Sequence, residues 1–262
     1  MPVKQTAKIL ARSRSLAFTR DHLAQGSQVG SLRRYTWRGV PIQYRAGTSD
    51  TGLIYNILLK TGLKGEYCPP HEFGADWGAV RVVLDIGANI GISALYFASI
   101  FPQAAIHAFE PEPGNFKLLT ANTASCPRIR CYPFALGASD GEITLFDSDD
   151  RVNFGGFSAH NAGTSAGRGK AVPVRHAGKV LRELGIASVD VIKIDTEGAE
   201  WDILTACGKE LVATARLILG ELHGHRDFAL LDFLQPSFHI GLNKGIKKRL
   251  FNFYAVNRRT PD

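Results

Sequence analysis

Acidic side chains stand where several apolar runs of this sequence end. Asp85, Glu110 and Asp195 lie at the ends of three such runs, and a fourth run ends at Glu221, two residues before His223. If these runs are parallel strands, their carboxyl ends meet at one edge of a sheet, where open α/β folds bind their ligands. Carboxylates can accept hydrogen bonds from sugar hydroxyls or pair with a cation, and a histidine beside them can take up a proton near neutral pH. The residues therefore predict an acidic ligand site that can move a proton.

A glycine turn directly after Asp85 narrows the choice of ligand. The turn reads Gly87-Ala88-Asn89-Ile90-Gly91 and lacks the G-x-G-x-x-G spacing that seats a dinucleotide pyrophosphate. Glu110 follows Gly91 by 19 residues and ends the second expected strand. In folds that bind a nucleoside cofactor, an acid at this position accepts hydrogen bonds from the ribose hydroxyls. An acid in front of the turn repels a pyrophosphate but suits a ligand with an ammonium and a sulfonium. We therefore expect S-adenosylmethionine; the simpler alternative is that Asp85 caps the turn and the glycines serve packing.

Alternating apolar runs and helical patterns from residue 81 onward indicate the sheet that must position these residues. Strand, helix and strand in that order form the right-handed parallel crossover unit, and the runs downstream can be interpreted as more of the same sheet. We expect a doubly wound, Rossmann-like α/β fold that is mostly parallel, with an antiparallel hairpin at its C-terminal edge. The expected strands are 81–86, 104–110, 129–134, 142–147, 171–175, 189–195, 215–221, 238–242 and 251–256, and the expected helices are 91–100, 113–122, a short one between 175 and 189, one from about 199, and 227–234.

The chain is expected to divide into three parts. A weak helical stripe and one strand, 37–44, precede helix caps at 48–50, and Gly62 supplies a stop for the helix that follows. The Gly/Ser/Asn-rich loop 151–169 is a candidate lid or substrate loop, because long structureless connections are usually functional or disordered. In order, the predicted parts are a basic extension with a strand at 1–47, a helical segment that can lie over the cofactor as a lid at 48–80, and a cofactor-binding domain at 81–262.

Composition bounds the class of protein. Apolar residues make up 45% and charged residues 21% of the 262, which are ordinary globular values. The sequence has neither an apolar run near the ~20 residues that a membrane span needs nor the apolar core of a signal peptide, so a cytoplasmic protein without a membrane span is expected. The four cysteines lack C-x-x-C spacing, which argues against a zinc site or a disulfide scaffold.

Basic residues gather towards both ends of the chain, whose net charge is +7. Residues 1–45 carry nine Lys and Arg against one acid, and a second cluster comprises Lys244, Lys247, Lys248 and Arg249. Such clusters attract phosphates, nucleic acid or anionic lipid, but they are more often a solvated face. Because no aromatic-interleaved basic motif accompanies them, nucleic acid is a secondary candidate partner. A homodimer is kept open as an assembly.

Four ordered motifs resemble the FkbM family of S-adenosylmethionine-dependent methyltransferases. They are Leu84–Gly91, Ala108–Phe116, Ala135–Gly137 with Gly141 and Glu142 shortly after, and Ile192–Glu200. The resemblance covers about residues 50 to 223, so the basic ends lie outside it. It implies a class I methyltransferase sheet and O-methylation, in this family typically of sugar or natural-product hydroxyls. The expected acceptor is therefore a saccharide or another small molecule.

The resemblance extends to contacts with the cofactor. Glu66 and Tyr67 match the family's pattern before the first strand. Asp140 is a candidate acceptor for the adenine amino group, with a simple turn at Gly141 as the alternative. The predicted cofactor-binding residues are Glu66, Tyr67, Asp85, Gly87, Asn89, Gly91, Glu110, Pro111, Ala135, Leu136, Asp140 and Asp195.

Asp195, Glu197 and His223 are the predicted catalytic residues. A sugar hydroxyl must be aligned with the methyl group, and a base or a metal helps to remove its proton. Two carboxylates and an imidazole also serve without a metal, so no metal ligand is assigned, and a divalent ion held by these three is the alternative. Simpler roles are a favourable charge at a helix N-terminus for Glu197 or Glu200 and a structural hydrogen bond for His223. Lys193, inside a buried strand, is expected to pair with one of these acids.

Two other functions stay open from the sequence. The basic ends prompt a methyltransferase that acts on RNA or a protein side chain, for which salt-dependent RNA binding is the marker. The other is a methyltransferase-like domain that binds a nucleoside without catalysis. Stabilisation by S-adenosylhomocysteine but not by NAD favours a methyltransferase over a dehydrogenase.

Overall fold

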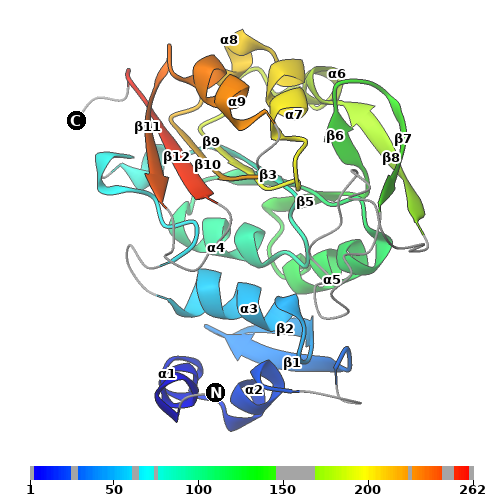
Figure 1. The fold of residues 1–262 in the computed structure, drawn as a ribbon, viewed down its shortest axis with the longest axis vertical. Coiled ribbons are helices and arrows are strands. Elements are labelled where there is room, and N and C mark those ends of the chain that lie inside the picture. Colours follow the sequence, from blue (N-terminus) through cyan, green and yellow to red (C-terminus); the bar gives the residue numbers. More distant parts are fainter. Residues whose placement is uncertain are drawn as a thin grey trace.

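The computed structural model describes residues 3–24, 29–60, 65–73, 76–145, 169–223, 226–243 and 251–259. Seven strands of this part of the chain form a central sheet in the order β11-β12-β10-β9-β3-β4-β5 (Figure 1). Strand β3 lies between β4 and β9, so the direction in which strands are added reverses beside it. Open α/β sheets bind ligands at the carboxyl ends of the strands at such a reversal. The strands are β3 Val82–Ile86, β4 Ala105–Phe109, β5 Ile129–Tyr132, β9 Val191–Ile194, β10 Leu217–Leu222, β11 Phe238–Asn243 and β12 Phe251–Asn257.

The sheet is parallel from β5 to β10 and antiparallel at its other edge. Strand β12 pairs antiparallel with β10 on one side and with β11 on the other. The last described strand therefore lies inside the sheet, and β11 forms the edge. This arrangement confirms the predicted doubly wound, mostly parallel sheet with an antiparallel C-terminal hairpin.

Helices cover both faces of the sheet (Figure 1), which is why its strands are apolar nearly throughout. Strand β9 is buried at every position. One hydrophobic core gathers around Phe97 and Phe101, and the other gathers around Leu204 and Leu234. The first core contains residues of α4 Ile92–Ile100 and α5 Pro113–Thr123, and the second contains residues of α6 Ala177–Glu183, α7 Glu200–Cys207, α8 Lys209–Val212 and α9 Asp227–Leu234.

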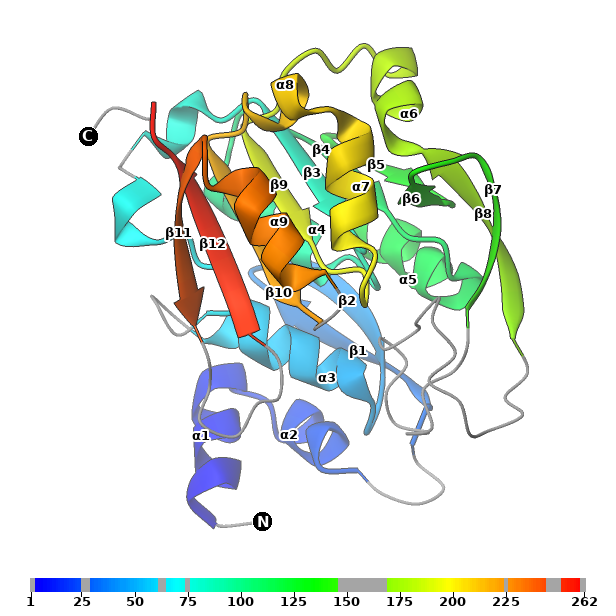
Figure 2. The same cartoon turned by 45° about the horizontal axis from the view of Figure 1, so that its top comes forward.

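Three strands form a separate small sheet beside the main one (Figure 2). They are β6 Ala135–Gly137, β7 Gly141–Leu145 and β8 Lys170–His176, with β8 in the middle. The interpretation that all downstream strands extend one sheet is therefore wrong for 142–147 and 171–175. Most residues of β7 and β8 are exposed or half-buried, unlike strands that are covered on both faces.

The N-terminal segment packs against α4 and α5. It comprises α1 Val3–Ser13, α2 Leu16–His22, the hairpin of β1 Leu32–Trp37 and β2 Val40–Arg45, α3 Ser49–Leu53, the π-helical turn η2 Ile54–Leu59, and two 3-10 turns, η4 His71–Phe73 and η5 Trp77–Ala79. Ile9, Phe18 and Tyr44 are fully buried in the same core as Phe97. The three-part division of the chain at residues 47 and 80 stays a prediction.

A hairpin replaces the single strand predicted at 37–44. Arg38 and Gly39 turn the chain with φ angles of 49° and 85°, and two left-handed residues are what a two-residue hairpin turn requires. The strand Leu32–Trp37 was missed because its polar and apolar positions do not alternate cleanly. The helix cap at Thr48 is confirmed, since its hydroxyl accepts from Asp50 N at 3.2 Å.

Some sequence predictions concern residues outside the described part of the chain. These are the stop at Gly62, the loop 151–169 except for residue 169, and the basic cluster at 244–249. Among the described residues, no helix combines the length and apolar character needed to cross a bilayer.

Candidate active site

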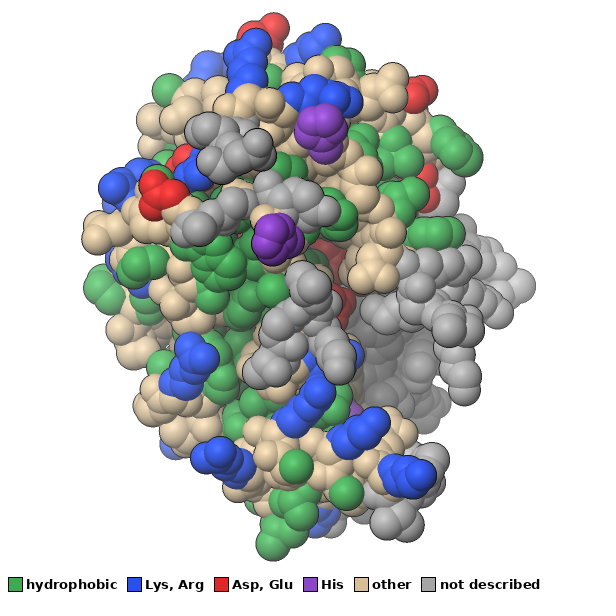
Figure 3. All heavy atoms as spheres, turned by 90° about the vertical axis from the view of Figure 1, so that its left-hand side faces the viewer, with side chains coloured by type: hydrophobic (Ala, Val, Ile, Leu, Met, Phe, Trp, Pro, Cys, Tyr) green, Lys and Arg blue, Asp and Glu red, His purple; other side chains and the backbone are tan. Residues whose placement is uncertain are grey.

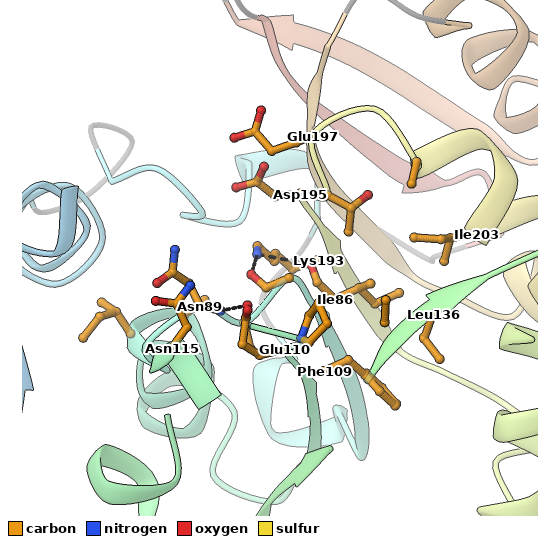
Figure 4. Close-up of a pocket in the computed structure, with 18 of the residues that line it drawn as sticks. Ile86, Asn89, Phe109, Glu110, Asn115, Leu136, Lys193, Asp195, Glu197 and Ile203 are labelled. Carbon is orange, nitrogen blue, oxygen red and sulfur yellow. Dashed lines mark hydrogen bonds between the residues drawn. The ribbon is translucent and has the colours of Figure 1, made fainter. Parts of the chain in front are cut away.

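A cavity opens at the carboxyl ends of β3, β4 and β9, beside the reversal of strand order (Figure 4). It encloses about 930 Å³ with its open mouth included, which falls within the range of pockets for cofactor-sized ligands. Asn89, Glu110 and Asn115 lie together in one part of the cavity, and Asp195 and Glu197 lie in another. Phe109, Leu136 and Ile203 form an apolar wall.

In the turn after β3, the backbone of Gly87 lines the cavity without a side chain. Gly87 N and Ala88 N both donate to the carbonyl of Phe109, at 3.1 and 2.9 Å. Gly87 has a φ of 77°, and a Cβ there would lie 2.0 Å from the carbonyl oxygen of Asp195. Only glycine therefore lets β3 and β9 approach so closely at the cavity floor.

Gly91 has a different task. It precedes α4 with a φ of 88°, and a Cβ there would lie 2.8 Å from Leu119 Cδ1 on α5. It is absent from the described cavity wall. Gly91 therefore supports the turn and the packing of α4 on α5, and its predicted contact with the cofactor stays a prediction.

Glu110 lines the cavity just after β4. One carboxylate oxygen accepts from Asn89 N and the other from Glu112 N, both at 2.9 Å. Burial raises the pKa of Glu110 to about 7. Each carboxylate oxygen has a second lone pair, so the anchored side chain can still accept from a ligand's hydroxyls. Asn89 Oδ1 is buried beside it without a hydrogen-bond partner among the described residues.

Asp85 lies beneath the cavity rather than in its wall. The side chain is fully buried, accepts from Ser93 Oγ at 2.6 Å, and lies 3.5 Å from Lys193 Nζ. Burial raises the pKa of Asp85, and Lys193 opposes that shift. Lys193 also donates to the carbonyls of Ile86 and Gly87, at 3.2 and 2.5 Å. The predicted pairing of Lys193 with an acid thus takes place with Asp85, not with Glu197 or Glu200, and Lys193 rather than Asp85 faces the cavity.

The three predicted catalytic residues meet at one end of the cavity, which we call its mouth: Asp195 and Glu197 line the cavity, and His223 lies beside them, outside the described wall. His223 Nε2 lies 3.7 Å from Asp195 Oδ1 and 3.5 Å from Glu197 Oε2. Burial alone would lower the pKa of His223, but the hydrogen bond and charge of Glu200 and the charges of Asp195 and Glu197 raise it to about 9. Glu197 adopts the left-handed region with a φ of 55°, which is uncommon for a residue other than glycine. The mouth therefore combines two half-buried carboxylates with a buried imidazole.

Two further side chains hold this group in place. Glu200, at the start of α7, accepts from Thr196 N at 2.8 Å and from Gly198 N at 3.1 Å, and its Oε1 lies 3.0 Å from His223 Nδ1. The helix-terminus role considered for Glu200 is therefore combined with fixing the imidazole. Tyr67 OH donates to Asp195 Oδ2 at 3.0 Å.

The N-terminal segment reaches the cavity through Leu53, Ile57 and Tyr67, and Arg45 contacts a cavity residue from outside the described wall. Leu53 and Ile57 contribute apolar side chains to its wall. Arg45 is paired with Asp50 at 2.7 Å and donates to Asn115 Oδ1 at 2.6 Å, and Asn115 lines the cavity. The segment 48–80 thus supplies part of the wall, while its movement as a lid stays a prediction.

Comparison with known proteins identifies the domain. The family model for the methyltransferase FkbM domain matches residues 85–242, more than half of the chain. The chain belongs to the FkbM methyltransferase family. Its cofactor is accordingly S-adenosylmethionine, and the domain is a S-adenosylmethionine-dependent methyltransferase domain.

Relatives of this FkbM-family chain differ in size. It is 29% identical to the AMB antimetabolite synthetase AmbE of Pseudomonas aeruginosa, over 56% of the chain but only 9% of AmbE. It is 28% identical to the 2-O-methyltransferase NoeI of Sinorhizobium fredii, over 61% of the chain and 72% of NoeI. It is 28% identical to the hexuronic acid methyltransferase AglP of Haloferax volcanii, over 56% of the chain and 57% of AglP.

The residues of the cavity fit the cofactor of the FkbM family. Glu110 offers anchored acceptors for the ribose hydroxyls, and the unpartnered Asn89 Oδ1 offers another acceptor for a ligand. Phe109, Leu136 and Ile203 suit an adenine ring. Lys193 shields Asp85, so the attraction between Asp85 and a sulfonium is weaker than the sequence interpretation assumed.

The structure brings most of the predicted cofactor contacts together, but not all. The predicted residues that line the cavity are Tyr67, Gly87, Asn89, Glu110, Pro111, Ala135, Leu136 and Asp195. Asp140 is half exposed and accepts from His176 N at 2.9 Å and Lys179 Nζ at 3.0 Å, so it fixes a turn outside the described cavity wall. Glu66 also lies outside that wall.

Several cavity residues escaped the sequence analysis. They include Leu53, Ile57, Phe109, Asn115, Ile143 and Ile203. Phe109 directly precedes Glu110 in the second motif, so its position was a usable signal. Asn115 lies in the same motif, whereas the others are ordinary apolar residues and nothing in their local sequence separates them from core residues.

Proposed function

We propose that this FkbM-family protein methylates a hydroxyl group of a saccharide or natural-product acceptor. The observation that carries the proposal is the group at the mouth, where His223 lies within 3.7 Å of both Asp195 and Glu197. Asp195 and Glu197 are carboxylates that can take a proton from a hydroxyl, and they lie in a different part of the cavity from Glu110. A pocket with a ribose-binding acid at one end and proton acceptors at the other suits O-methylation.

The residues divide the work between binding and proton transfer. When bound, S-adenosylmethionine supplies an electrophilic methyl group on a sulfonium, and transfer leaves S-adenosylhomocysteine. Glu110 and Asn89 hold the nucleoside part. Asp195 accepts the proton as the acceptor oxygen forms its bond to the methyl carbon, and the hydrogen bond from Tyr67 fixes the orientation of Asp195. Holding the acceptor in line contributes most of the rate, because the reaction is a displacement at carbon.

The names of two relatives support a sugar-like acceptor. NoeI is named a 2-O-methyltransferase and AglP a hexuronic acid methyltransferase. The mouth of the cavity is polar, and the half-buried Asp195 and Glu197 are acceptors for the hydroxyls of a sugar.

Basic side chains keep an anionic acceptor, RNA included, as a second candidate. Figure 3 shows Lys and Arg side chains across the lower part of the molecule, where Figure 1 places α1 and α2. The exposed ones in these two helices and the turn between them include Lys4, Lys8, Arg14 and Arg20. Salt-dependent RNA binding would favour this candidate.

The experiment is a transfer assay with radiolabelled S-adenosylmethionine and a panel of saccharides, glycosides and RNA. We expect label in at least one saccharide or glycoside, and Asp195→Asn should lower kcat by at least ~100-fold while S-adenosylhomocysteine still binds. Asp232→Asn, an exposed acid on α9, is the matched control and should retain full activity. Label in RNA alone, or an undiminished rate for Asp195→Asn, would overturn the proposal.

A further inference from the structure

The catalytic group at the mouth has the composition of a metal site. One oxygen each from Asp195 and Glu197 and one ring nitrogen of His223 lie within 4.8 Å of one another. Two carboxylates and an imidazole are ligands that divalent first-row transition ions accept. Three protein ligands leave coordination positions free for a substrate, as in catalytic metal sites.

The distances suit coordination better than hydrogen bonding. His223 Nε2 lies 3.7 and 3.5 Å from the nearest oxygens of Asp195 and Glu197. Direct hydrogen bonds between these groups would be about 2.7–3.0 Å long. Two ligands bound at about 2.1 Å to one tetrahedral ion lie about 3.4 Å apart. Small side-chain movements would therefore place all three around an ion.

A second observation points to a ligand at the same place. The side chain of His223 is only 6% exposed, and neither ring nitrogen has a well-aligned hydrogen-bond partner among the described residues. Nε2 points between Asp195 and Glu197, while the other ring nitrogen, Nδ1, lies 3.0 Å from Glu200 Oε1. Metal-binding histidines are held in this way, with one nitrogen on a carboxylate and the other on the ion.

The charge around the imidazole favours a cation as well. Besides Asp195, Glu197 and Glu200, Glu221 Oε2 lies 3.9 Å from His223 Nε2. The ammonium of Lys193 lies on Asp85 and on two backbone carbonyls instead. Carboxylate oxygens thus lie within 3.9 Å of both ring nitrogens of His223, and carboxylates are ligands that divalent ions accept.

We propose that Asp195, Glu197 and His223 bind one divalent first-row transition ion at the mouth of the cavity, with Glu200 as the positioning residue for His223. The open coordination positions would take the acceptor oxygen. The ion would then stabilise the oxygen's negative charge, while Asp195 would take the proton with the carboxylate oxygen that does not bind the ion. This catalytic role rests on the proposed function, whereas binding of the ion can be measured without it.

The test is a Mn²⁺ titration of the full chain after removal of bound metal with EDTA, followed by the electron paramagnetic resonance signal of free Mn²⁺. We expect one site per chain. Asp195→Asn and His223→Ala should each weaken binding by at least ~100-fold, and Glu200→Gln by ~10-fold, as for carboxylates that orient metal ligands. Asp232→Asn is the matched control and should bind like the wild type. S-adenosylhomocysteine binding by each variant shows that it is folded.

The outcomes separate this inference from the proposed function. No Mn²⁺ binding at millimolar concentration, or equal binding by wild type and His223→Ala, would overturn the metal site. If methyl transfer to a saccharide also continues undiminished in EDTA, the proposed function stands alone. If Mn²⁺ binds with the expected variant pattern but no hydroxyl acceptor is methylated, the metal site stands and the proposed function fails.

Discussion

Tyr67 and Asp195 lie 128 positions apart in the chain, and a hydrogen bond of 3.0 Å joins the tyrosine hydroxyl to Asp195 Oδ2. Tyr67 is 3% exposed, so its ring is fixed by packing and its hydroxyl has little freedom. The segment that precedes β3 thereby sets the orientation of the carboxylate at the end of β9.

Tyr67→Phe should lower kcat by ~10-fold, because a hydrogen bond to a charged group contributes about 1.5–3 kcal/mol. KM for the acceptor and the affinity for S-adenosylhomocysteine should change little, since the ring remains. Steady-state kinetics with both substrates varied would measure this. A variant with unchanged kcat would show that Asp195 needs no orientation by Tyr67.

The affinity for S-adenosylhomocysteine should rise with pH through the pKa of Glu110, which burial raises to about 7. Ribose hydroxyls donate to the carboxylate, so the protonated form binds more weakly. Calorimetric titrations should therefore give ~10-fold tighter binding at pH 8 than at pH 6. In Glu110→Gln the affinity should be lower and this pH dependence absent; a pH dependence that persists in the variant would assign it to another group.

Glu110 should affect the unfolding free energy of the unliganded chain in the opposite direction, lowering it as the pH rises. The pKa of Glu110 is higher in the folded chain than its ordinary value of 4.5, so folding favours the protonated form. That contribution to stability is fully present below the ordinary pKa and is lost as the pH rises through about 7. Urea unfolding of wild type and Glu110→Gln at pH 5 and pH 8 would measure this. From pH 5 to pH 8, the wild type should lose unfolding free energy relative to the variant.

Gly87→Ala should destabilise the fold more than Gly39→Ala, where the only cost is a backbone conformation that is unfavourable for alanine. A Cβ on Gly87 would lie 2.0 Å from a backbone oxygen, whereas one on Gly39, with a similar φ of 85°, meets nothing within 4 Å. We expect a loss of about 1 kcal/mol for Gly39→Ala and of about 3 kcal/mol or more for Gly87→Ala. Urea unfolding of both variants gives the comparison, and equal losses would contradict the close approach of Gly87 to Asp195.

Lys193→Met should lower the unfolding free energy by about 3 kcal/mol or more, because it leaves the buried Asp85 without its cation. The double variant Lys193→Met, Asp85→Asn should lose less than the sum of the two single losses. A double-mutant cycle in urea measures this coupling. Additive losses would mean that the 3.5 Å pair does not account for the burial of Asp85.

The acidic strand ends were predictable because chemistry and periodicity agree there. Glu110, Asp195 and Glu197 line the cavity, since side chains that follow parallel strands meet at one edge whatever the order of the strands. The partner of Asp85 was not predictable in the same way. Lys193 stands opposite Asp85 in the ladder between β3 and β9, and local sequence carries no information on which strands become neighbours.

Asp140 shows that a sequence motif does not predict the direction in which a nearby side chain points. Its place after the third motif indicated a contact with adenine, but the distance from a motif in sequence does not fix the direction of a side chain. In the structure, a lysine and a backbone amide of the small sheet and its following helix hold it away from the cavity. The small sheet itself was missed as a separate unit, because the sequence indicated β7 and β8 but not their partners, and β6 was not predicted as a strand.

The position of β12 between β10 and β11 has a consequence for synthesis of the protein on the ribosome. Strand β11 precedes β12 in the chain, but its neighbour in the sheet is β12. Strand β11 can therefore join the sheet only after β12 has been synthesised. Asn252 on β12 also donates to Glu221 Oε1 at 2.8 Å, at the end of the strand that leads to His223. A nascent chain can therefore form the pairing of β10 with β12, and the hydrogen bond to Glu221, only after β12 has emerged, and shorter chains leave this edge of β10 unpaired.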